Sequence, residues 1–396
     1  MTVFTEAVYK SLTKKGEELC GDNVAITRTE DSVIVVMADG LGSGVKANIL
    51  STLTTKIAST MMEKQASIEE VVNTLAETLP VCKVRKLAYS TFTILKVENN
   101  NGNAYLYEFG NPDVIFLKNS RLTQLPKSSL KIHGREIREA RFVLKPGDKL
   151  FMISDGVVHA GVGEILNLGW QWPNVAAYLE RLEHTKKHRI SEMVNLLIKA
   201  CNQMYAGKPG DDTTVVGIQI KQPQYLTIFT GPPEDNTKDK EVVEKLIKSK
   251  GKKVVCGGTA ANIVSRETGK KIITNIDSYE FDPGIPPTAE IEGIDLVTEG
   301  VLTLSRCVEI LENFQDTNTS DTDFLETISR KKDGASRLLN LLPNESTHIH
   351  FLVGRAVNSA HQNPNLPRDL TIKIKVVKEL INLLSKLNKK ITIDYY

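Results

Sequence analysis

Hydrophobic and polar residues follow one pattern in the first half of the chain and a different pattern in the second. In the first half, β-branched runs such as residues 32–38 are separated by hairpin-length turns, and helical apolar stripes occur in blocks between them. Short connections favour antiparallel pairing, because parallel strands need a long crossover. This half therefore predicts antiparallel sheets covered by helices, an α+β arrangement.

The elements of the first half can be placed from their periodicity and their boundary residues. Ser67 is the expected N-cap of a helix, because Glu70 follows three residues later as in a capping box. The Asn-Asn-Asn-Gly turn at residues 99–102 predicts a hairpin. The expected helices cover residues 46–64, 68–79, 175–183 and 190–205, and the expected strands cover residues 23–29, 32–38, 89–97, 104–109, 113–118, 149–153 and 214–220.

The second half alternates strands with helices. It begins after the polar segment 221–224, which we interpret as a domain boundary between residues 1–222 and 223–396. Alternation predicts a doubly wound α/β domain with a mostly parallel sheet, and the acidic, Thr-rich segment 315–323 is expected to be a loop. The expected strands cover residues 225–229, 253–256, 295–297, 348–353 and 390–395, and the expected helices cover residues 238–249, 302–312 and 371–387, with one more starting near Thr259.

Composition and charge exclude several classes of protein. The 50 Lys and Arg residues against 48 Asp and Glu leave a formal charge of +2, so no whole-chain field favours nucleic acid or an anionic membrane. No apolar stretch approaches the roughly 18 residues of a membrane-spanning helix, and residues 1–6 do not resemble a secretory signal. The cysteines are odd in number and far apart, which predicts free thiols. We therefore expect a soluble, cytoplasmic protein.

Four acidic turns in the first half lie at predicted strand ends. Asp39 and Asp155 follow apolar strands, whereas Asp22 and Asp211 precede strands. Because the start of one antiparallel strand lies beside the end of its neighbour, all four carboxylates can meet at one edge. Converging carboxylates repel one another unless cations hold them, and hard divalent ions prefer oxygen ligands. A lone Asp-Gly is an ordinary turn, so this prediction depends on the ordered set.

Four motifs also match a known enzyme family in order and spacing. They are Ala-Asp-Gly-Leu-Gly-Ser-Gly at 38–44, Phe-Gly-Asn-Pro at 109–112, Ser-Asp-Gly-Val at 154–157 and Asp-Asp-Thr-Thr at 211–214. Over residues 15–220 the sequence resembles the bacterial sporulation-type (SpoIIE-like) branch of the metal-dependent Ser/Thr protein phosphatases, protein phosphatase type 2C. The resemblance implies an antiparallel β-sandwich flanked by helices, the αββα phosphatase fold.

The resemblance also implies a set of ligands for two Mn²⁺ or Mg²⁺ ions. Asp39 would bridge both ions, and the carbonyl of Gly40 would coordinate the second. Asp155 and Asp211 would hold the first ion. The remaining implied ligands are Asp22, at the second ion directly or through water, and Asp212, which stands where animal relatives often have Asn.

The sequence departs from many animal relatives at the expected proton donor. Leu41 stands where those relatives have a His, and their N-terminal phosphate-binding Arg has no counterpart. His159 lies four residues after Asp155, where relatives often carry an acidic residue near an extra metal. His159 could donate a proton or ligate a third ion, and a partly exposed histidine at a helix start is the alternative interpretation.

The implied activity is hydrolysis of phosphoserine or phosphothreonine on a protein, by attack of a metal-bridging hydroxide and without a phosphoenzyme. The implied substrate is a small phosphorylated regulatory protein of the anti-sigma-factor antagonist type. The helices after Gly44 are the expected switch element. The alternative is a catalytically weak or inactive phosphatase-fold module that binds partners. The oligomeric state stays open, with a homodimer among the alternatives.

The second half resembles no family that we recognise. Glycines and polar residues follow its predicted strands, and Gly257-Gly258-Thr259 opens a helix that could hold an anion, with Arg355 as a counter-charge. Tight turns explain the same glycines equally well. The hypothesis is a regulatory domain that senses a small molecule or nucleotide. An enzyme using Glu299 or Asp277 is a further alternative. The pair His184/His188 is interpreted as part of a solvated face, and the pair His348/His350 as structural.

Overall fold

The computed structural model divides the chain into two compact units, Met1–Gln222 and Pro223–Tyr396, which we call the first and second units. Each is described by itself below. Among the residues that the structure describes, no helix is both long and apolar enough to cross a membrane. The described residues are 1–79, 90–185, 188–274, 288–316, 328, 333–356 and 372–396.

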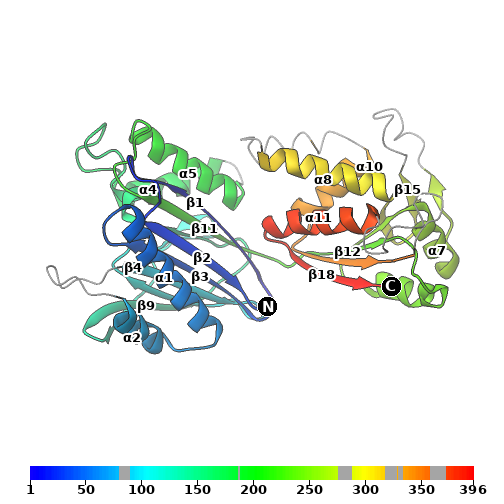
Figure 1. Cartoon of the computed structure of the whole chain (residues 1–396), viewed down its shortest axis with the longest axis horizontal. Helices are drawn as coiled ribbons and strands as arrows, with labels where there is room; N and C mark the ends of the chain where they lie inside the picture. Colours follow the sequence, from blue (N-terminus) through cyan, green and yellow to red (C-terminus); the bar gives the residue numbers. More distant parts are fainter. Residues whose placement is uncertain (80–89, 186–187, 275–287, 317–327, 329–332, 357–371) are drawn as a thin grey trace. The chain divides into compact units, whose positions relative to one another are not determined.

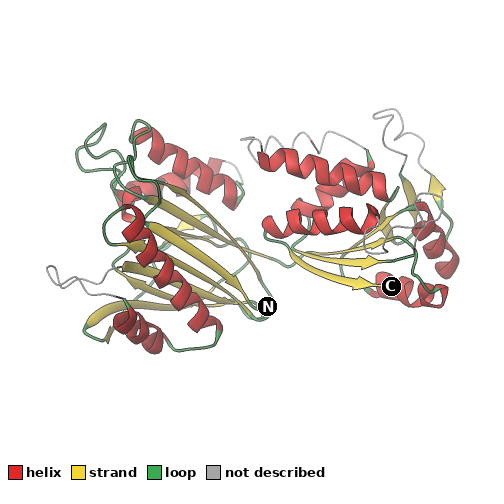
Figure 2. Ribbon diagram, in the orientation of Figure 1, coloured by secondary structure: helices red, strands yellow, loops and turns green. Residues whose placement is uncertain are grey.

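The first unit contains two antiparallel sheets (Figures 1 and 2). The five-stranded sheet has the spatial order β1 (Phe4–Leu12), β11 (Thr213–Lys221), β10 (Lys149–Ile153), β6 (Ile115–Lys118), β7 (Arg121–Leu122). The six-stranded sheet has the order β2 (Asp22–Arg28), β3 (Ser32–Gly40), β4 (Ser90–Glu98), β5 (Asn103–Phe109), β9 (Arg135–Val143), β8 (Ser128–Ile132).

Helices cover the outer faces of both sheets. α1 and α2 pack on the six-stranded sheet through one hydrophobic cluster, and α4 and α5 pack on the five-stranded sheet through another. A third cluster joins the inner faces of the two sheets. The result is the predicted αββα sandwich. The helices of this unit are α1 (Gly44–Glu63), α2 (Ile68–Thr78), α3 (Asp155–Val158), α4 (Trp172–Thr185) and α5 (Ile190–Met204).

Strand β3 shows why the sequence adopts this layered arrangement. Its apolar run is continuous because both faces of the strand are buried. Val33, Val35 and Met37 point between the sheets, whereas Ile34 and Val36 point toward the helices. Burying an apolar side chain of this size contributes about 1.5–3 kcal/mol, so a one-residue slip in register would be costly.

Local signals predicted most elements of the first unit, but not all of them. The capping box at α2 is present, with the Glu70 amide donating to Ser67 Oγ at 3.2 Å and the Ser67 amide donating to Glu70 Oε2 at 2.7 Å. The hairpin of β8 and β9 was not predicted, because its charged side chains interrupt the apolar pattern. β1 was also not predicted, since it depends on pairing with β11 over its whole length. The helix α3, which is four residues long, was not predicted either.

The second unit contains one seven-stranded sheet. Five of its strands are parallel, namely β16, β13, β12, β17 and β18. An antiparallel pair at one edge, β14 with β15, was not predicted, because each of these strands is only two or three residues long. The spatial order is β14 (Ile273–Thr274), β15 (Ala289–Ile291), β16 (Ile294–Thr298), β13 (Lys252–Cys256), β12 (Tyr225–Thr230), β17 (His348–Val353), β18 (Lys390–Tyr395).

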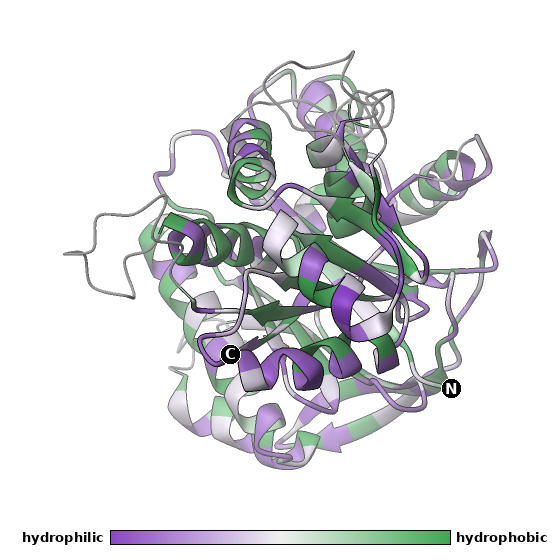
Figure 3. Cartoon of the chain, turned by 90° about the vertical axis from the view of Figure 1, so that its right-hand side faces the viewer, coloured by the Kyte–Doolittle hydropathy of each residue, from purple (hydrophilic) through white to green (hydrophobic). Residues whose placement is uncertain are grey.

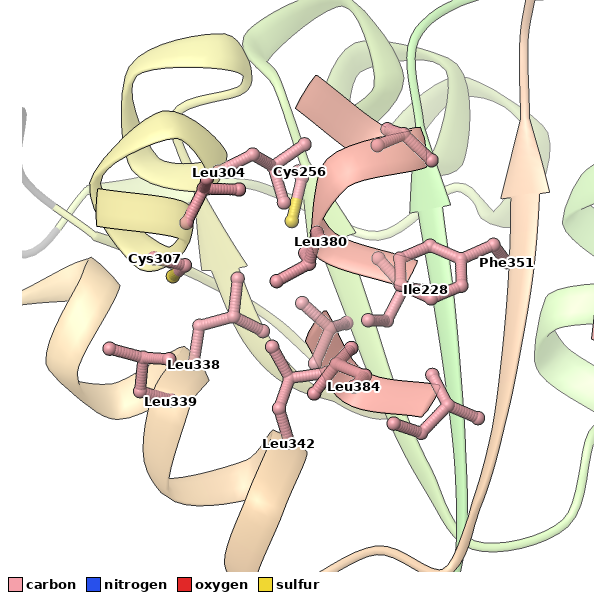
Figure 4. Close-up of a cluster of buried hydrophobic side chains, with 14 of the residues drawn as sticks. Ile228, Cys256, Leu304, Cys307, Leu338, Leu339, Leu342, Phe351, Leu380 and Leu384 are labelled. Atoms are coloured by element: carbon pink, nitrogen blue, oxygen red, sulfur yellow. The ribbon is translucent and has the colours of Figure 1, made fainter. Parts of the chain in front are cut away.

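Helices lie on both faces of this sheet, as predicted for a doubly wound domain. α6 and α7 pack on one face, and α8, α10 and α11 pack on the other, where Cys256, Ile228 and Phe351 meet Leu380 (Figure 4). In Figure 3 the strands are mostly apolar and the helices turn polar residues outward. The helices are η1 (Asn236–Lys238), α6 (Asp239–Lys248), α7 (Gly258–Thr268), α8 (Val301–Asp316), α10 (Gly334–Leu339), η3 (Asn340–Asn344) and α11 (Ile372–Lys386).

Two sequence-based expectations fall partly or wholly outside the described residues. Residues 315 and 316 of the expected acidic loop belong to the end of α8, and residues 317–323 lie outside the described ranges. Asp277 also lies outside them. The four described cysteines are free thiols, as predicted, and Cys82 lies outside the described residues.

Candidate metal centre

Two aspartates lie on adjacent strands of the six-stranded sheet. Asp22 begins β2, and Asp39 is the second-last residue of β3. The antiparallel register places them directly opposite each other. Asp39 has the same parity as Met37, whose side chain points between the two sheets. The pair therefore faces the five-stranded sheet.

Three more aspartates come from the end of the five-stranded sheet. Asp155 follows β10 as the first residue of α3. Asp211 and Asp212 directly precede β11, which pairs with β10. The Asp212 amide donates to Asp211 Oδ1 at 3.1 Å, so the two carboxylates have fixed local positions. We call these five residues (Asp22, Asp39, Asp155, Asp211 and Asp212) the acidic cluster.

Electrostatics shows that the members of the acidic cluster act on one another. Burial raises the pKa of Asp39 to about 9, and the other four carboxylates all raise it as well. Burial also raises the pKa of Asp22 to about 7, with further contributions from Asp212 and Asp155. Burial and Asp211 raise the pKa of Asp155. Without a cation, this arrangement disfavours full ionisation of the cluster.

Asp22 has two buried oxygens for which the described residues provide no hydrogen-bond donor of ordinary geometry. The residue is 5% exposed, and neither Oδ atom accepts a hydrogen bond of ordinary geometry from the described residues. The hydroxyls of Ser154 and Thr214 lie near enough to lower its pKa. Because leaving a buried polar group unpaired costs about 1–3 kcal/mol, these oxygens fit a cation that completes their coordination.

Glycines allow the backbone to close around the acidic cluster. A Cβ at Gly40 would lie 2.0 Å from the carbonyl oxygen of Ala47 in α1. A Cβ at Gly156 would lie 2.1 Å from the carbonyl oxygen of Asp212. Both close contacts involve backbone atoms, so neither can be relieved by rotating a side chain. The two Asp-Gly pairs are therefore required for packing beside the cluster as well as for chain direction.

The acidic cluster is open in this conformation. Within the described ranges, no three Asp, Glu, His or Cys side chains come together closely enough to hold a metal ion. The mutual effects on pKa show that Asp22, Asp39 and Asp155 are electrostatic neighbours nonetheless. The donor set consists of carboxylates, which suits Mg²⁺ or Mn²⁺. A bound ion would have to draw the side chains together.

Two residues near the acidic cluster were not found from the sequence. Lys14 Nζ lies 3.6 Å from Asp211 Oδ1, and the Lys14 amide donates to Asp212 Oδ1 at 3.0 Å. Burial, with smaller contributions from the carboxylates of Asp22 and Asp212, raises the pKa of the Cys20 thiol to about 12. Both residues belong to the irregular segment between β1 and β2, where no sequence periodicity indicates position.

His159 lies beside the acidic cluster but at the surface. It caps the short helix α3, its amide donates to the Asp155 carbonyl at 2.9 Å, and it is exposed. Its charge lowers the pKa of Asp155. An adjoining loop packs on the His159 backbone at Gly169, and its exposed apolar side chains are Val162, Ile165 (64%) and Leu168 (78%).

Several residues at the expected ligand-binding edge of the second unit make contacts within the fold. Gly257 has φ +117 and precedes α7, so the turn conformation itself requires a glycine there. The Arg355 guanidinium lies 4.6 Å from the centre of the Tyr395 ring, and Glu299 accepts a hydrogen bond from the Leu302 amide at the start of α8. The pair His184 and His188 belongs to the first unit. His184 is exposed at the end of α4, whereas His188 is half-buried and pairs with Glu192 at 2.9 Å.

One known protein family matches a segment within the first unit. Residues 29–221 match the family described as Stage II sporulation protein E (SpoIIE). The chain matches no curated protein. The family match confirms the resemblance to the SpoIIE-like branch of the metal-dependent protein phosphatases.

Several solved structures are similar at low sequence identity. The PP2C phosphatase domain of SpoIIE from Bacillus subtilis, with a fragment of its regulatory domain, is 20% identical with a TM-score of 0.47. That match covers 56% of this chain and 64% of the other. The RsbU and RsbW domains of a Mycobacterium tuberculosis protein are 14% identical with a TM-score of 0.45, covering 62% and 68%. RsbX in complex with magnesium is 21% identical with a TM-score of 0.41, covering 55% and 100%.

Proposed function

We propose, from the premise that residues 29–221 belong to the SpoIIE family, that the first unit is a metal-dependent phosphoprotein Ser/Thr phosphatase. Enzymes of this family are hydrolases. The observation that carries the proposal is the position of Asp39, where four other aspartates from both sheets act on one carboxylate. A cluster of this kind, which repels itself when ionised, is stable in its charged form only with cations.

The residues divide naturally between two cations. Both cations would share Asp39, since it lies opposite Asp22 and its pKa is also raised by Asp155 and Asp211. Asp155 and Asp211 would hold one ion, and Asp22 would hold the other. Bound divalent ions activate the attacking water and offset charge on the phosphoryl group. The remaining proposed ligands are the carbonyl of Gly40 and the carboxylate of Asp212.

Residues around the cluster would position the ligands. The Thr214 amide donates to Ser154 Oγ at 2.8 Å, and the Ser154 amide donates to the Thr214 carbonyl at 3.0 Å. This reciprocal pair locks α3 against β11 and so fixes Asp155 beside Asp211. Preorganisation of this kind lowers the cost of assembling the charged site.

The exposed loop beside His159 supports a protein substrate. Ile165 and Leu168 expose more than half of their surface next to the acidic cluster. Apolar side chains grouped beside a charged site suit a folded phosphoprotein better than a small phosphate ester. We propose a phosphorylated regulatory protein of the anti-sigma-factor antagonist type, in line with the SpoIIE family.

We further propose that the second unit senses a ligand. Its doubly wound sheet is an architecture that commonly binds small molecules. A second candidate function, a phosphatase-fold module that binds partners without turnover, is favoured by the open conformation of the acidic cluster, in which no three described carboxylates converge. The two candidates differ in whether divalent ions produce turnover.

Hydrolysis of an aryl phosphate and of a phosphoserine peptide by the full chain tests the proposal. We expect Mn²⁺-dependent turnover that falls by at least about 10³ in Asp155→Ala, because the ion that activates water would be lost. Asp31→Ala, an exposed aspartate outside the cluster, is the matched control. Absent turnover would favour the binding module, and equal turnover in both variants would contradict the proposed role of Asp155.

A further inference from the structure

A large hollow lies on one face of the sheet in the second unit. Its volume is about 570 Å³, within the range of small-molecule sites. The floor is formed by the first residues of three adjacent parallel strands, β12, β17 and β18. Register places Tyr225 beside His348 and His348 beside Lys390, and the next outward positions repeat the pattern with Thr227, His350 and Thr392.

The walls of this hollow are strongly basic. Lys245 and Lys248 approach from α6, and Lys250 follows that helix. Lys245 is neutralised by Asp394 at 2.5 Å, which also contacts His350 at 2.7 Å, and Lys248 pairs with Glu244 at 2.9 Å. In the part of the chain that the structure describes, no carboxylate forms an ion pair with Lys250 or Lys390. Two ammonium groups therefore remain to attract an anion.

An aromatic pair occupies the same floor. The rings of Tyr225 and His348 have centroids 4.8 Å apart, and Tyr225 is 37% exposed. Burial and the charge of Lys390 lower the pKa of His348 to about 4, so its ring is neutral at physiological pH. Neutral aromatic faces stack well on planar bases. The hollow thus offers stacking surface and positive charge within one site.

We propose that this hollow binds a mononucleotide, with its phosphates on Lys250 and Lys390 and its base against Tyr225 and His348. The volume suits one nucleotide rather than a nucleic acid strand. This site is on the sheet face and is separate from the glycine turns at the carboxyl ends of the strands. The inference rests on the sensing role proposed above and names its ligand. Nucleotide binding does not depend on the phosphatase activity proposed for the first unit.

The test is isothermal titration of the full chain with purine and pyrimidine mono-, di- and triphosphates, and with adenosine and inorganic phosphate as partial ligands. EDTA is included so that no divalent ion in the first unit attracts phosphate. We expect at least one nucleotide to bind, and adenosine and phosphate each to bind about tenfold more weakly or worse, because each supplies half of the contacts.

Variants locate the site and separate it from the first unit. Lys250→Gln with Lys390→Gln should weaken binding roughly tenfold or more, and Tyr225→Leu should weaken it as well. Lys240→Gln with Lys378→Gln removes two exposed lysines outside the hollow and should leave affinity unchanged. Asp39→Asn should also bind normally, so loss of phosphatase activity and loss of nucleotide binding are distinguishable.

Three results would overturn the proposal. The first is no nucleotide binding at millimolar concentration. The second is equal affinity in the hollow variant and in the Lys240 and Lys378 control. The third is phosphate binding as tight as nucleotide binding, which would mean an anion site without base recognition. Binding of an acidic peptide without binding of any nucleotide would overturn the proposal in the same way as the first result.

Discussion

Asp22 and Asp39 lie directly opposite each other across the ladder of β2 and β3, and both face the second sheet of the sandwich. Directly opposite like charges destabilise an antiparallel pair. The chain nevertheless buries Asp22 and half-buries Asp39, with the pKa of Asp22 at about 7 and that of Asp39 at about 9. This local conflict marks a site where stability is given up for chemistry.

The first prediction concerns the pH dependence of the metal-free protein. A carboxyl group whose folded pKa is raised above its unfolded value, about 3.9, stabilises the fold at low pH. That contribution is lost as pH rises through the folded pKa. We therefore expect the thermal midpoint in EDTA to fall from about pH 4, where the carboxyl groups of the unfolded chain ionise, and to level off once pH exceeds about 7 for Asp22 and about 9 for Asp39.

Substitution should remove much of this fall. Asp39→Asn keeps the shape of the side chain but cannot ionise, so its thermal midpoint should decline less steeply, as measured by calorimetry. Asp31→Asn, at an exposed position, should decline like the original chain. Parallel curves for Asp39→Asn and the original chain would show that this carboxylate is not strained.

The second prediction concerns Gly40. Alanine at this position would place a methyl group 2.0 Å from the Ala47 carbonyl, so α1 must move. We expect Gly40→Ala to destabilise the first unit by about 1–3 kcal/mol in urea titrations and to weaken Mn²⁺ binding. Gly210→Ala, where a methyl group meets only Tyr205 at 3.5 Å, is the control. Equal stability of the two variants would contradict the packing argument.

The third prediction concerns the ammonium group of Lys14, which lies beside Asp211. Lys14 Nζ lies 3.6 Å from Asp211, with side-chain exposures of 36% and 42%. Exposed pairs contribute about 0.2–1 kcal/mol, so Lys14→Gln should tighten Mn²⁺ binding by about two- to fivefold in calorimetric titrations. Lys15→Gln is the neighbouring control. If affinity falls in Lys14→Gln, the lysine supports the site rather than competing with the metal.

The fourth prediction concerns His159. Its exposed position near Asp155 suits a proton donor for the leaving oxygen. In His159→Ala we expect phosphatase activity to fall by about 10² or more and the alkaline limb of the pH–rate profile to change. His133→Ala, at another exposed histidine, should match the original chain. A His159→Ala profile that overlays the original would exclude this role.

Much of the fold could be predicted because its signals are local. The apolar run before Asp39, the capping box at Ser67 and the strand-helix alternation after residue 222 each follow from neighbouring residues. The edge hairpin of β8 and β9 could not be found in this way. The hairpin is stabilised by pairing of β9 with β5 and by ion pairs such as Lys127 with Glu108, which join distant segments.

The candidate sites show the same limit. The order of the aspartate motifs predicted their gathering at one edge, but the positions of Lys14 and Cys20 depend on how an irregular segment crosses the sandwich. His348 and His350 were interpreted as structural from one strand alone. Their place in a basic hollow becomes visible only when β12 and β18 are set beside that strand.

The central claim, that carboxylates from both sheets hold divalent ions at Asp39, is tested most directly by a crystal structure grown with Mn²⁺ and recorded for anomalous scattering. The account predicts anomalous peaks within about 2.5 Å of Asp39 Oδ atoms, with Asp155 and Asp211 drawn in on one side and Asp22 on the other. Crystals saturated with Mn²⁺ that show no peak at Asp39 would contradict it.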